Sequence, residues 1–517
     1  MIAKVNTAAL NGLAAMHVFI EANVRKCNNT EPQFMMVGLP DSAVRESRTR
    51  VMAALKSTQV CFQPNANIDV NFAPADVRKE GSSYDLPLAI ALAAADEKVS
   101  SQFLPKTMFV GELGLDGSLR AVRGALPIAI KAREMGYQNL VVPLENVREA
   151  AVVDTLRVYG AKTLQDVLNF CNGAECLERV QIDTRAEFAA AQVDCPFDFA
   201  EVKGQDMVKR AFEVAAAGGH NIILVGSPGC GKSMMAKRIP SILPPLTLRE
   251  SLETTQIHSV AGKLGSSDTL IKMRPFRAPH HSVSNVALIG GGSNFQPGEI
   301  SLAHNGILFL DEFPEFNRFV LETLRQPLED REIQISRAKY SVTLPCSVML
   351  VAAMNPCPCG HYNDPNHKCT CTPQQVKRYL NRISGPLMDR IDLQVEVIPV
   401  PVAELSKTPA GETSEQIRAR VMAARNIQNE RFKNIPGVHC NAQMSARQLQ
   451  TFAALDDKAS AYISHAIKRL NLSARAYERV LKVSRTIADL AGEKNIDKTH
   501  IAEALSYRNL DRESWGE

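Results

Sequence analysis

The chain lacks long apolar runs, a large net charge and the cysteine spacing of a disulfide-bonded protein. No apolar stretch approaches the ~20 residues that a bilayer-spanning helix needs, so we expect no membrane partner. The weakly apolar stretch 7–20 is interrupted by Asn11, Gly12 and His17, which argues against a signal peptide. The net charge of +4 is too small to indicate nucleic-acid binding by itself, so any basic surface must be local.

The composition is that of an ordinary globular protein, and the length is too great for one core. With 517 residues, 45% of them hydrophobic and 22% charged, the chain is expected to form roughly two to four domains. Its 12 cysteines comprise scattered single residues and one tight group. That distribution favours a reducing cytoplasm and a metal site over a disulfide framework.

A glycine-rich octapeptide between an apolar run and a helical stretch predicts a phosphate-binding loop. The apolar run 222–225 is typical of a buried parallel strand, and a helix is expected to follow the loop. Such a loop directs its backbone N–H groups and the positive end of the helix at a triphosphate. Lys232 would contact the outer phosphates, and the Ser233 hydroxyl would bind Mg²⁺. The predicted ATP contacts are Gly226, Ser227, Pro228, Gly229, Cys230, Gly231, Lys232, Ser233 and Met234.

Two carboxylates follow a second apolar run farther along the chain. The run 307–310 predicts another parallel strand, and Asp311 and Glu312 come directly after it. Asp311 can join the Mg²⁺ shell, while Glu312 can polarise a water that attacks the γ-phosphate. Alone, the two acids also suit a solvated strand end. Both motifs in this order, within one α/β unit, predict an ATPase.

Two further segments extend the predicted ATPase core. The apolar strand 347–353 leads to Asn355, whose amide can orient the attacking water, the role called sensor 1. The segment 328–344 has the β alternation on both sides of its centre and predicts a hairpin with a basic tip. At that tip Arg337 and Lys339 can contact DNA phosphates without reading bases. A solvated hairpin tip would have the same composition.

Four cysteines and two histidines lie within one short, turn-rich segment. The thiols are Cys357, Cys359, Cys369 and Cys371. They suit a tetrahedral Zn²⁺ site of the structural type. Both pairs have Cys-x-Cys spacing, whereas structural zinc loops commonly place two or more residues between paired cysteines. His361 or His367 could therefore replace one thiol, and unmetallated thiols are the alternative.

Residues 1–172 are expected to form an α+β domain, with a polar, helical connector at 173–196. The expected elements are a strand at 66–72, helices at 42–55 and 86–95, and a hairpin at 108–120 around an Asp-Gly turn. Residues 197–400 hold the ATPase motifs, and residues 412–509 are helical by pattern.

Three segments of the first domain, with the motifs above, resemble the magnesium-chelatase-like AAA+ ATPases of the competence-protein type. The segments are Val37-Gly-Leu-Pro40, Lys79-Glu-Gly-Ser-Ser-Tyr-Asp-Leu-Pro87 and Val110-Gly-Glu-Leu-Gly-Leu-Asp-Gly117. In that family the domain is similar to the proteolytic domain of Lon, in which a Ser nucleophile needs a Lys base. Ser83 lies near the nucleophile position, but Leu126 stands where the Lys would be. We therefore expect Ser83 to be a helix-entry residue and the domain to be a scaffold without peptidase activity.

The resemblance covers nearly the whole chain and implies a multidomain α/β fold. Its parts are a Lon-like domain at 1–172, a linker at 173–196, an AAA+ parallel-sheet core at 197–400 and a C-terminal helical lid at 401–517. The core would include the hairpin before sensor 1, which AAA+ helicases direct into their pore, and the cysteine-rich zinc loop that family members carry.

Two arginines take roles from the same resemblance. The stretch that ends in Asp389-Arg390 is similar to the family segment that carries an arginine finger, so Arg390 is the implied finger and Arg382 the second choice. The alternative for Arg390 is an ion pair within its own chain. Arg475 opens the penultimate helix after a Ser cap, where the family has the sensor 2 Arg that contacts the γ-phosphate. A surface Arg on a capped helix is the alternative there.

The resemblance further implies a bacterial, cytoplasmic protein that forms a homohexameric ring. Such a ring would use ATP and Mg²⁺ to move single-stranded or branched DNA through its pore, alongside the recombination machinery. The implied task is branch migration in homologous recombination during natural transformation. One alternative is a magnesium-chelatase-like motor that acts on a protein client. Another is an ATP-dependent peptidase, which Leu126 disfavours.

Overall fold

The computed structural model divides the chain into two compact units, Met1–Gln192 with Thr247–Lys272, and Val193–Leu246 with Met273–Glu517. No helix among the residues described is both long enough and apolar enough to cross a membrane. The structure describes residues 2–26, 33–62, 66–174, 176–190, 195–265, 268–292, 295–337, 340–362, 364, 367–400, 411–470 and 473–508.

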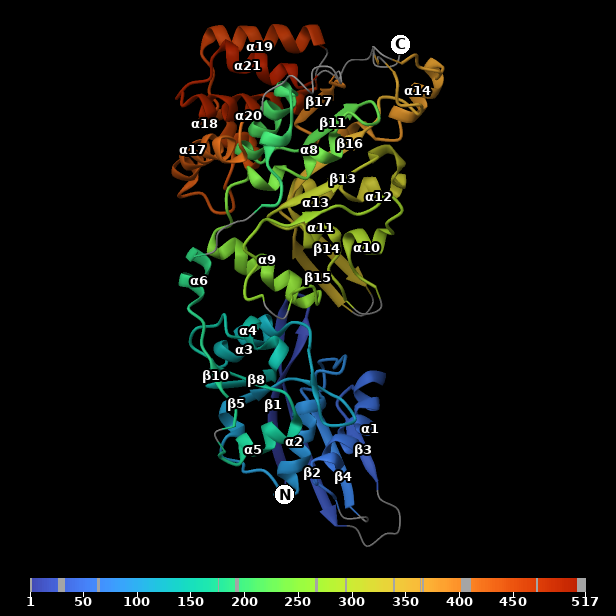
Figure 1. The fold of residues 1–517 in the computed structure, drawn as a ribbon, viewed down its shortest axis with the longest axis vertical. Helices are drawn as coiled ribbons and strands as arrows, with labels where there is room; N and C mark the ends of the chain where they lie inside the picture. The colour runs from blue at the N-terminus through green and yellow to red at the C-terminus, as the bar shows by residue number, and fades with distance from the viewer. Residues whose placement is uncertain are drawn as a thin grey trace. The chain divides into compact units, whose positions relative to one another are not determined.

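The first unit is built on a mixed eight-stranded sheet in the order β10-β9-β8-β5-β1-β2-β4-β3 (Figure 1). Long antiparallel pairing joins β1 to β2 and β2 to β4, while β5, β8 and β9 pair in parallel. The strands are β1 (Ile2–Asn11), β2 (Ala14–Lys26), β3 (Phe34–Val37), β4 (Ala66–Ala73), β5 (Thr107–Phe109), β8 (Asn139–Pro143), β9 (Arg157–Ala161) and β10 (Arg179–Val180).

Helices cover both faces of this sheet, because its side chains contribute alternately to two apolar cores. Helices α1, α2 and α5 bury their apolar residues in one core, and α3 and α4 bury theirs in the other. The expected hairpin is present between β6 (Glu112–Leu113) and β7 (Leu119–Arg120). The helices are α1 (Ser42–Ser57), α2 (Asp85–Ala95), α3 (Ala125–Glu134), α4 (Val147–Ala150), α5 (Leu164–Cys171), α6 (Thr184–Ala190) and α9 (Leu248–Val260).

The helix α9 lies between the phosphate loop and the Asp-Glu strand in sequence, yet it packs within the first unit. Glu149 is the main polar link, since its buried carboxylate accepts hydrogen bonds from the Leu126 backbone N–H and the Ser259 hydroxyl. Burial raises the pKa of Glu149, and these hydrogen bonds oppose that rise. Gln256 adds a 2.7 Å bond to the Leu13 carbonyl. Sequence order alone assigned this stretch to the ATPase core.

The second unit contains a parallel five-stranded sheet in the order β12-β13-β16-β11-β17. Because all five strands run the same way, their carboxyl ends meet at one edge, where ligands bind in open α/β sheets. The predicted α/β class is therefore confirmed. The strands are β11 (Ile222–Gly226), β12 (Phe276–Arg277), β13 (Ile307–Leu310), β16 (Met349–Met354) and β17 (Leu393–Val397).

Helices surround this sheet, and those of the C-terminal region share one apolar core with it. Helices α17 and α20 pack on α7. Helix α21 packs on α20, and both are labelled in Figure 1. The longer helices are α7 (Asp206–Gly218), α14 (Pro373–Leu380), α17 (Ser414–Phe432), α18 (Ala446–Phe452), α19 (Asp457–Leu470), α20 (Ala474–Ala491) and α21 (Lys498–Ser506). The shorter ones are α8 (Lys232–Ala236), α10 (Asn285–Ile289), α11 (Glu299–Leu302), α12 (Arg318–Thr323), α13 (Arg325–Asp330) and α15 (Gly385–Met388).

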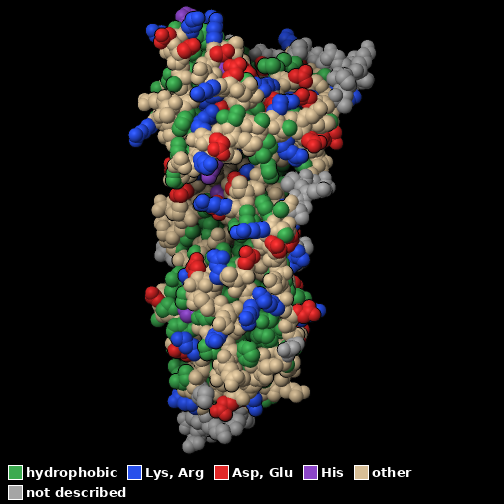
Figure 2. Space-filling view, turned by 90° about the vertical axis from the view of Figure 1, so that its left-hand side faces the viewer, with side chains coloured by type: hydrophobic (Ala, Val, Ile, Leu, Met, Phe, Trp, Pro, Cys, Tyr) green, Lys and Arg blue, Asp and Glu red, His purple; other side chains and the backbone are tan. Residues whose placement is uncertain are grey.

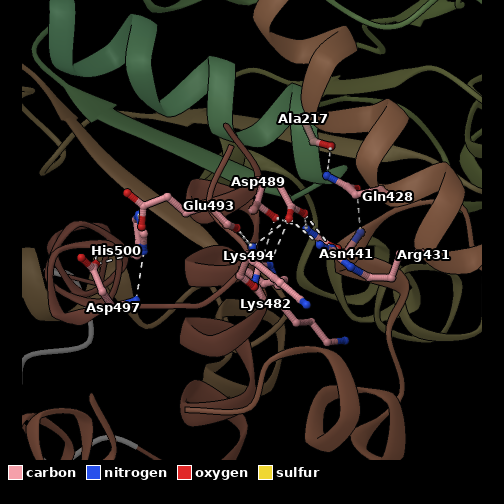
Figure 3. Close-up of polar contacts among 12 residues, drawn as sticks. Ala217, Gln428, Arg431, Asn441, Lys482, Asp489, Glu493, Lys494, Asp497 and His500 are labelled. Carbon is pink, nitrogen blue, oxygen red and sulfur yellow. Dashed lines mark hydrogen bonds and ion pairs between the residues drawn. The ribbon is translucent and has the colours of Figure 1, made fainter. Parts of the chain in front are cut away.

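A buried carboxylate, Asp489, holds the helical region together (Figure 3). Arg431 donates to both of its oxygens, at 2.5 and 2.7 Å, and so joins α17 to α20. Asn441 donates to the same group at 2.8 Å, and Arg485 donates at 3.0 Å. The side chain of Asp489 is fully buried, so its charge depends on these donors.

Replacing Asp489 with Ala is expected to lower the free energy of unfolding of the second unit by about 3–5 kcal/mol, because two arginines lose their buried counter-charge. Chemical denaturation followed by circular dichroism measures the loss. Asp497→Ala is the matched control, since this exposed carboxylate only caps α21 and its loss costs about 1 kcal/mol. Equal losses in the two variants would contradict the role assigned to Asp489.

Candidate nucleotide site and arginine pocket

The predicted phosphate loop joins β11 to α8 at the carboxyl edge of the parallel sheet. Gly229 and Gly231 have φ angles of +79° and +91°, in the left-handed region that favours glycine. These angles turn the chain sharply from the strand into the helix. Residues 226–233 thereby form the loop that the sequence predicted, at the edge where an anion would meet the amino end of α8.

The ammonium group of Lys232 lies inside this loop. It donates to the carbonyl oxygens of Gly226 at 2.5 Å and Ser227 at 2.9 Å. A third bond, of 3.2 Å, reaches the side-chain oxygen of Asn355, which directly follows β16. The structure therefore brings together Lys232 and the predicted sensor amide, although 123 residues separate them in sequence.

Ser233 and Asp311 meet as the Mg²⁺ prediction requires. The Ser233 hydroxyl donates to Asp311 Oδ2 at 2.5 Å, and Asp311 Oδ1 accepts from the Glu312 backbone N–H at 3.0 Å. A hydroxyl and a carboxylate oxygen side by side suit Mg²⁺, which completes its shell with phosphate oxygens and waters. These two side chains are the residues that would hold the ion.

Glu312 has an unusual backbone conformation, and its side chain pairs with a histidine. Its φ of +52° lies in the left-handed region, a strained conformation for a non-glycine residue and one that clusters at functional sites. Its carboxylate lies 2.9 Å from Nδ1 of His281, which follows β12, the strand beside β13. The sequence predicted Glu312 but missed His281. The sole signal was its place in the segment 276–282, between the two ATP motifs.

A second polar site, here called the arginine pocket, contains both arginines with predicted roles. It has a volume of about 410 Å³, and Arg390 and Arg475 both line it. Arg390 donates to the Arg325 carbonyl at 3.0 Å and the Pro386 carbonyl at 2.7 Å, and it forms an ion pair with Glu329. Its side chain is thus held within its own chain.

Further cations surround the arginine pocket. Arg479 pairs at 2.8 Å with the fully buried Asp392, and His220 lies 3.3 Å from the same carboxylate. Burial alone would raise the pKa of Asp392, but Arg479 and His220 hold it well below its usual range. Burial and the neighbouring Arg479 lower the pKa of Lys482 to about 8. The lining as a whole has five basic side chains against the acidic Glu329, Asp389 and Glu478, an excess of positive charge that suits a phosphate group.

Neither Lys232 nor Ser233 is among the described residues that line the arginine pocket. Arg382, the second choice for a finger, lies outside this set as well and pairs with Glu315 at 2.6 Å. The predicted Ser cap is present, because the Ser473 side chain accepts from the Ala476 N–H and begins α20 just before Arg475. In one chain, the predicted finger Arg390 and the predicted sensor 2 residue Arg475 therefore line one pocket, to which the phosphate-loop residues Lys232 and Ser233 do not contribute.

The predicted basic hairpin is formed by β14 (Glu332–Arg337) and β15 (Tyr340–Pro345), with Arg337 paired to Tyr340. Arg337 is exposed at the tip, whereas Lys339 lies outside the described residues. The Tyr340 hydroxyl donates to the Gly292 carbonyl at 2.9 Å. The glycine loop 290–292 thus approaches this hairpin.

The four cysteines converge. The sulfur of Cys357 lies 3.3 Å from that of Cys359 and 3.7 Å from that of Cys369. The sulfurs of Cys359 and Cys369 are 3.5 Å apart. All four sulfurs, including that of Cys371, are within 4.8 Å of one another. Ligands of a tetrahedral zinc site with Zn–S bonds of about 2.3 Å are ~3.8 Å apart. The thiols therefore fit Zn²⁺ without a histidine ligand.

In the first unit, Ser83 lies at the entry of α2 as expected, although Tyr84 occupies the N-cap position and no side chain caps the helix. The Ser83 carbonyl accepts from the Gly111 N–H at 3.0 Å. Leu126 is fully buried in the core of α3. An apolar side chain at that place supplies no base for a serine nucleophile.

Comparisons with known proteins match this architecture in three consecutive segments. Residues 198–405 match the family described as magnesium chelatase, subunit ChlI. Residues 20–146 match subunit ChlI of Mg-chelatase, and residues 411–508 match the C-terminal part of magnesium chelatase subunit ChlI. In chain order, the three matches cover the N-terminal region, the segment with both ATP motifs and the helical region.

Several curated relatives resemble the chain over its full length. The competence protein ComM of Haemophilus influenzae is 44% identical over 99% of this chain and 98% of its own. The uncharacterized protein YifB of Escherichia coli is 43% identical over 98% and 97%. A more distant match, 24% identical over 32% of this chain and 35% of its own, is the DNA repair protein RadA of Halalkalibacterium halodurans. The chain therefore belongs to the magnesium-chelatase-like AAA+ ATPases of the type of competence protein ComM.

Proposed function

We propose that the chain is an ATP-driven DNA motor that works as a hexameric ring and promotes branch migration in homologous recombination during natural transformation. The observation that carries the ATPase part is the meeting of Lys232, Ser233, Asp311 and Asn355 at one edge of the parallel sheet. Similarity to a relative named competence protein ComM supports the proposed role in natural transformation.

Each side chain has a distinct task in the proposed hydrolysis. Lys232 would neutralise the outer phosphates, and Ser233 and Asp311 are the side chains that would hold Mg²⁺. Glu312 accepts a proton from the attacking water, and the Asn355 amide orients that water. When bound, Mg²⁺ would neutralise charge on the phosphates, and the protein side chains would hold the phosphates and the attacking water in position.

Arg390 and Arg475 are proposed to act on the nucleotide of a neighbouring subunit. They line one pocket together, and Lys232 and Ser233 do not line it. A guanidinium brought by a neighbour stabilises the charge of the transferring phosphoryl group and makes hydrolysis depend on ring assembly. The ion pair of Arg390 with Glu329 would break when the neighbour's phosphates arrive.

Replacing His281 with Ala is expected to raise the basal rate of ATP turnover about two- to fivefold, because Glu312 would be freed from its partner. The side chains of the pair are 33% and 57% exposed, so the pair contributes at most about 1 kcal/mol. Steady-state phosphate release measures the change.

His280→Ala is the matched control for this prediction. The ring of His280 lies next to that of His281, with centroids 4.0 Å apart and a tilt of 36°, but its own Nδ1 lies 2.9 Å from the Ser282 hydroxyl. Its loss should leave turnover within twofold of the unmodified protein, a threshold of ~0.4 kcal/mol. A lower rate in His281→Ala would instead make His281 a residue that positions Glu312 for hydrolysis.

The DNA part of the proposal rests on the hairpin and on family resemblance. On the face drawn in Figure 2, basic side chains are interspersed with acidic ones, so overall charge does not guide the assignment. Arg337 on the hairpin presents a guanidinium suited to phosphates. The distant similarity to a protein named DNA repair protein RadA points to the same class of substrate.

ATP turnover measured with four-way DNA, linear duplex and unfolded protein tests this function. Branched DNA is expected to stimulate turnover most. Stimulation by unfolded protein alone would favour a motor that acts on a protein client, as the chelatase family name suggests. Casein cleavage that Ser83→Ala abolishes would favour a peptidase.

Replacing Arg337 with Ala is expected to weaken DNA binding similarly for all sequences and to make its salt dependence shallower. The loss of one phosphate contact reduces the slope of log K against log salt by about 0.7–0.9. Binding measured by fluorescence anisotropy across a salt series gives the slope. An unchanged slope would remove Arg337 from the DNA contact.

Zn²⁺ is proposed as a structural ion held by Cys357, Cys359, Cys369 and Cys371, because the sulfur distances fit it. The ion would fix the segment that follows Asn355. All four positions would be filled by thiolates, which leaves no open position for catalysis.

A further inference from the structure

A second group of metal-binding side chains lies in the cysteine-rich segment, apart from the four thiols. It consists of His361, Asp364 and His367, whose ligand atoms all lie within 4.8 Å of one another. Nδ1 of His361 is 3.2 Å from Asp364 Oδ2, and Nδ1 of His367 is 3.6 Å from the same oxygen. Both imidazoles thus direct the same nitrogen at one carboxylate oxygen.

These distances fit ligands of one ion better than a pair of hydrogen bonds. A contact of 3.6 Å is too long for a hydrogen bond. Ligands at about 2.1 Å from a tetrahedral ion lie ~3.4 Å apart, between the two observed values. The centroids of the two imidazole rings are 4.8 Å apart, and the rings are tilted by 34° to each other.

Exposure and ligand type also favour a metal site. The Asp364 side chain is 2% exposed, while those of His361 and His367 are 32% and 66% exposed. An ion can therefore enter from solvent and keep water as a further ligand. Two neutral imidazoles and one carboxylate suit Zn²⁺ and similar transition ions rather than Mg²⁺ or Ca²⁺.

The carboxylate of this group also contacts the phosphate loop. The Ser227 hydroxyl donates to Asp364 Oδ2 at 2.7 Å. At Gly360 the φ angle is +85°, and a Cβ there would lie 2.6 Å from Pro228 Cδ, so the backbone at Gly360 approaches the Pro228 ring as closely as glycine permits. The segment thus holds the loop at Ser227 and Pro228.

We propose that His361, Asp364 and His367 form a second site for a divalent transition-metal ion, separate from the four thiols, and that this ion fixes Asp364 against Ser227 of the phosphate loop. The effect on ATP rests on the proposed nucleotide-binding function, whereas the metal site does not. With Asp364 as a ligand of the ion, Ser227 would be the outer hydrogen-bonding partner that metal-bound side chains commonly have.

Cobalt titration of the full-length protein tests the site. The protein is stripped of metal under reducing conditions and reloaded with Co²⁺. One equivalent is expected to give an intense thiolate charge-transfer band, and another equivalent only weak ligand-field absorption. Uptake of a single equivalent, or a second one with a thiolate band, would overturn the proposal.

Asp364→Asn separates the ion from the hydrogen bond, because the amide oxygen still accepts from Ser227. This variant is expected to keep the thiolate band and to bind the second equivalent at least about 10-fold more weakly. His367→Ala should behave alike, and His465→Ala, at an exposed position of α19, should bind as the unmodified protein does. Unchanged binding of the second equivalent in the first two variants would overturn the site.

The link to the phosphate loop has its own measurement. Loading the second site in the unmodified protein is expected to lower the Kd for ATP about two- to tenfold, the range for one hydrogen bond held in place. In Asp364→Asn the same additions of Co²⁺ should leave that Kd unchanged. If the second ion leaves the Kd for ATP unchanged in the unmodified protein as well, the link is overturned. Failure of ATP binding in every protein would count against the proposed function. The number of metal ions bound would still test the metal site.

Discussion

Replacing Glu312 with Gln is expected to lower the rate of ATP hydrolysis by about 10²–10⁴, with ATP binding retained. The amide cannot accept the proton of the attacking water. The contacts of Lys232 and the pairing of Ser233 with Asp311 do not involve Glu312, so nucleotide should still bind. Single-turnover hydrolysis and equilibrium binding of ATP measure the two effects separately.

Glu430→Gln is the matched control, since this carboxylate on α17 is 78% exposed and faces only Lys433. Its turnover should equal that of the unmodified protein. If Glu312→Gln hydrolyses ATP at the unmodified rate, another group activates the water and the role proposed for Glu312 is excluded.

Replacing Arg390 with Ala is expected to lower ATP turnover by about 10³–10⁵, the range for loss of an arginine finger. The reason is the charge that develops on the transferring phosphoryl group, which the guanidinium would stabilise from a neighbouring subunit. Turnover is measured at a protein concentration at which the ring is assembled.

Mixing two inactive variants tests whether Arg390 acts between subunits. Arg390→Ala retains its phosphate loop, and Lys232→Ala retains its arginine. If the arginine acts across an interface, mixed rings contain sites with both groups intact, and turnover should reappear. No recovery would place Arg390 in its own subunit's site. A larger loss in Arg382→Ala than in Arg390→Ala would transfer the finger to Arg382.

The family and the α/β class could be predicted because both depend on short patterns. The octapeptide 226–233 and the pair Asp311-Glu312 each follow an apolar run, and in parallel strands such ends meet at one edge. The hairpin at 332–345 and the Ser473 cap likewise depend on residues close in sequence. Local periodicity and capping determine such features.

The missed features all depend on contacts between distant residues. Nothing near His281 indicates that its ring meets Glu312, because the pairing of β12 with β13 creates that contact. Asp364 and Ser227 are 137 residues apart. Ser259 meets Glu149 over 110 residues, and this buried contact helps to place α9 in the first unit. Order along the chain did not indicate any of these partners.

The placement of Thr247–Lys272 has a practical consequence. The backbone crosses from one unit to the other after Gln192, after Leu246 and after Lys272. The N-terminal part is therefore not an appendage that can be cut off at a single linker. A fragment beginning at Val193 would carry α9 without the core of α3 and α4 against which Leu248 and Leu252 pack, and exposed apolar residues of this kind promote aggregation. Dissecting the protein requires that the segment be excised and its ends rejoined.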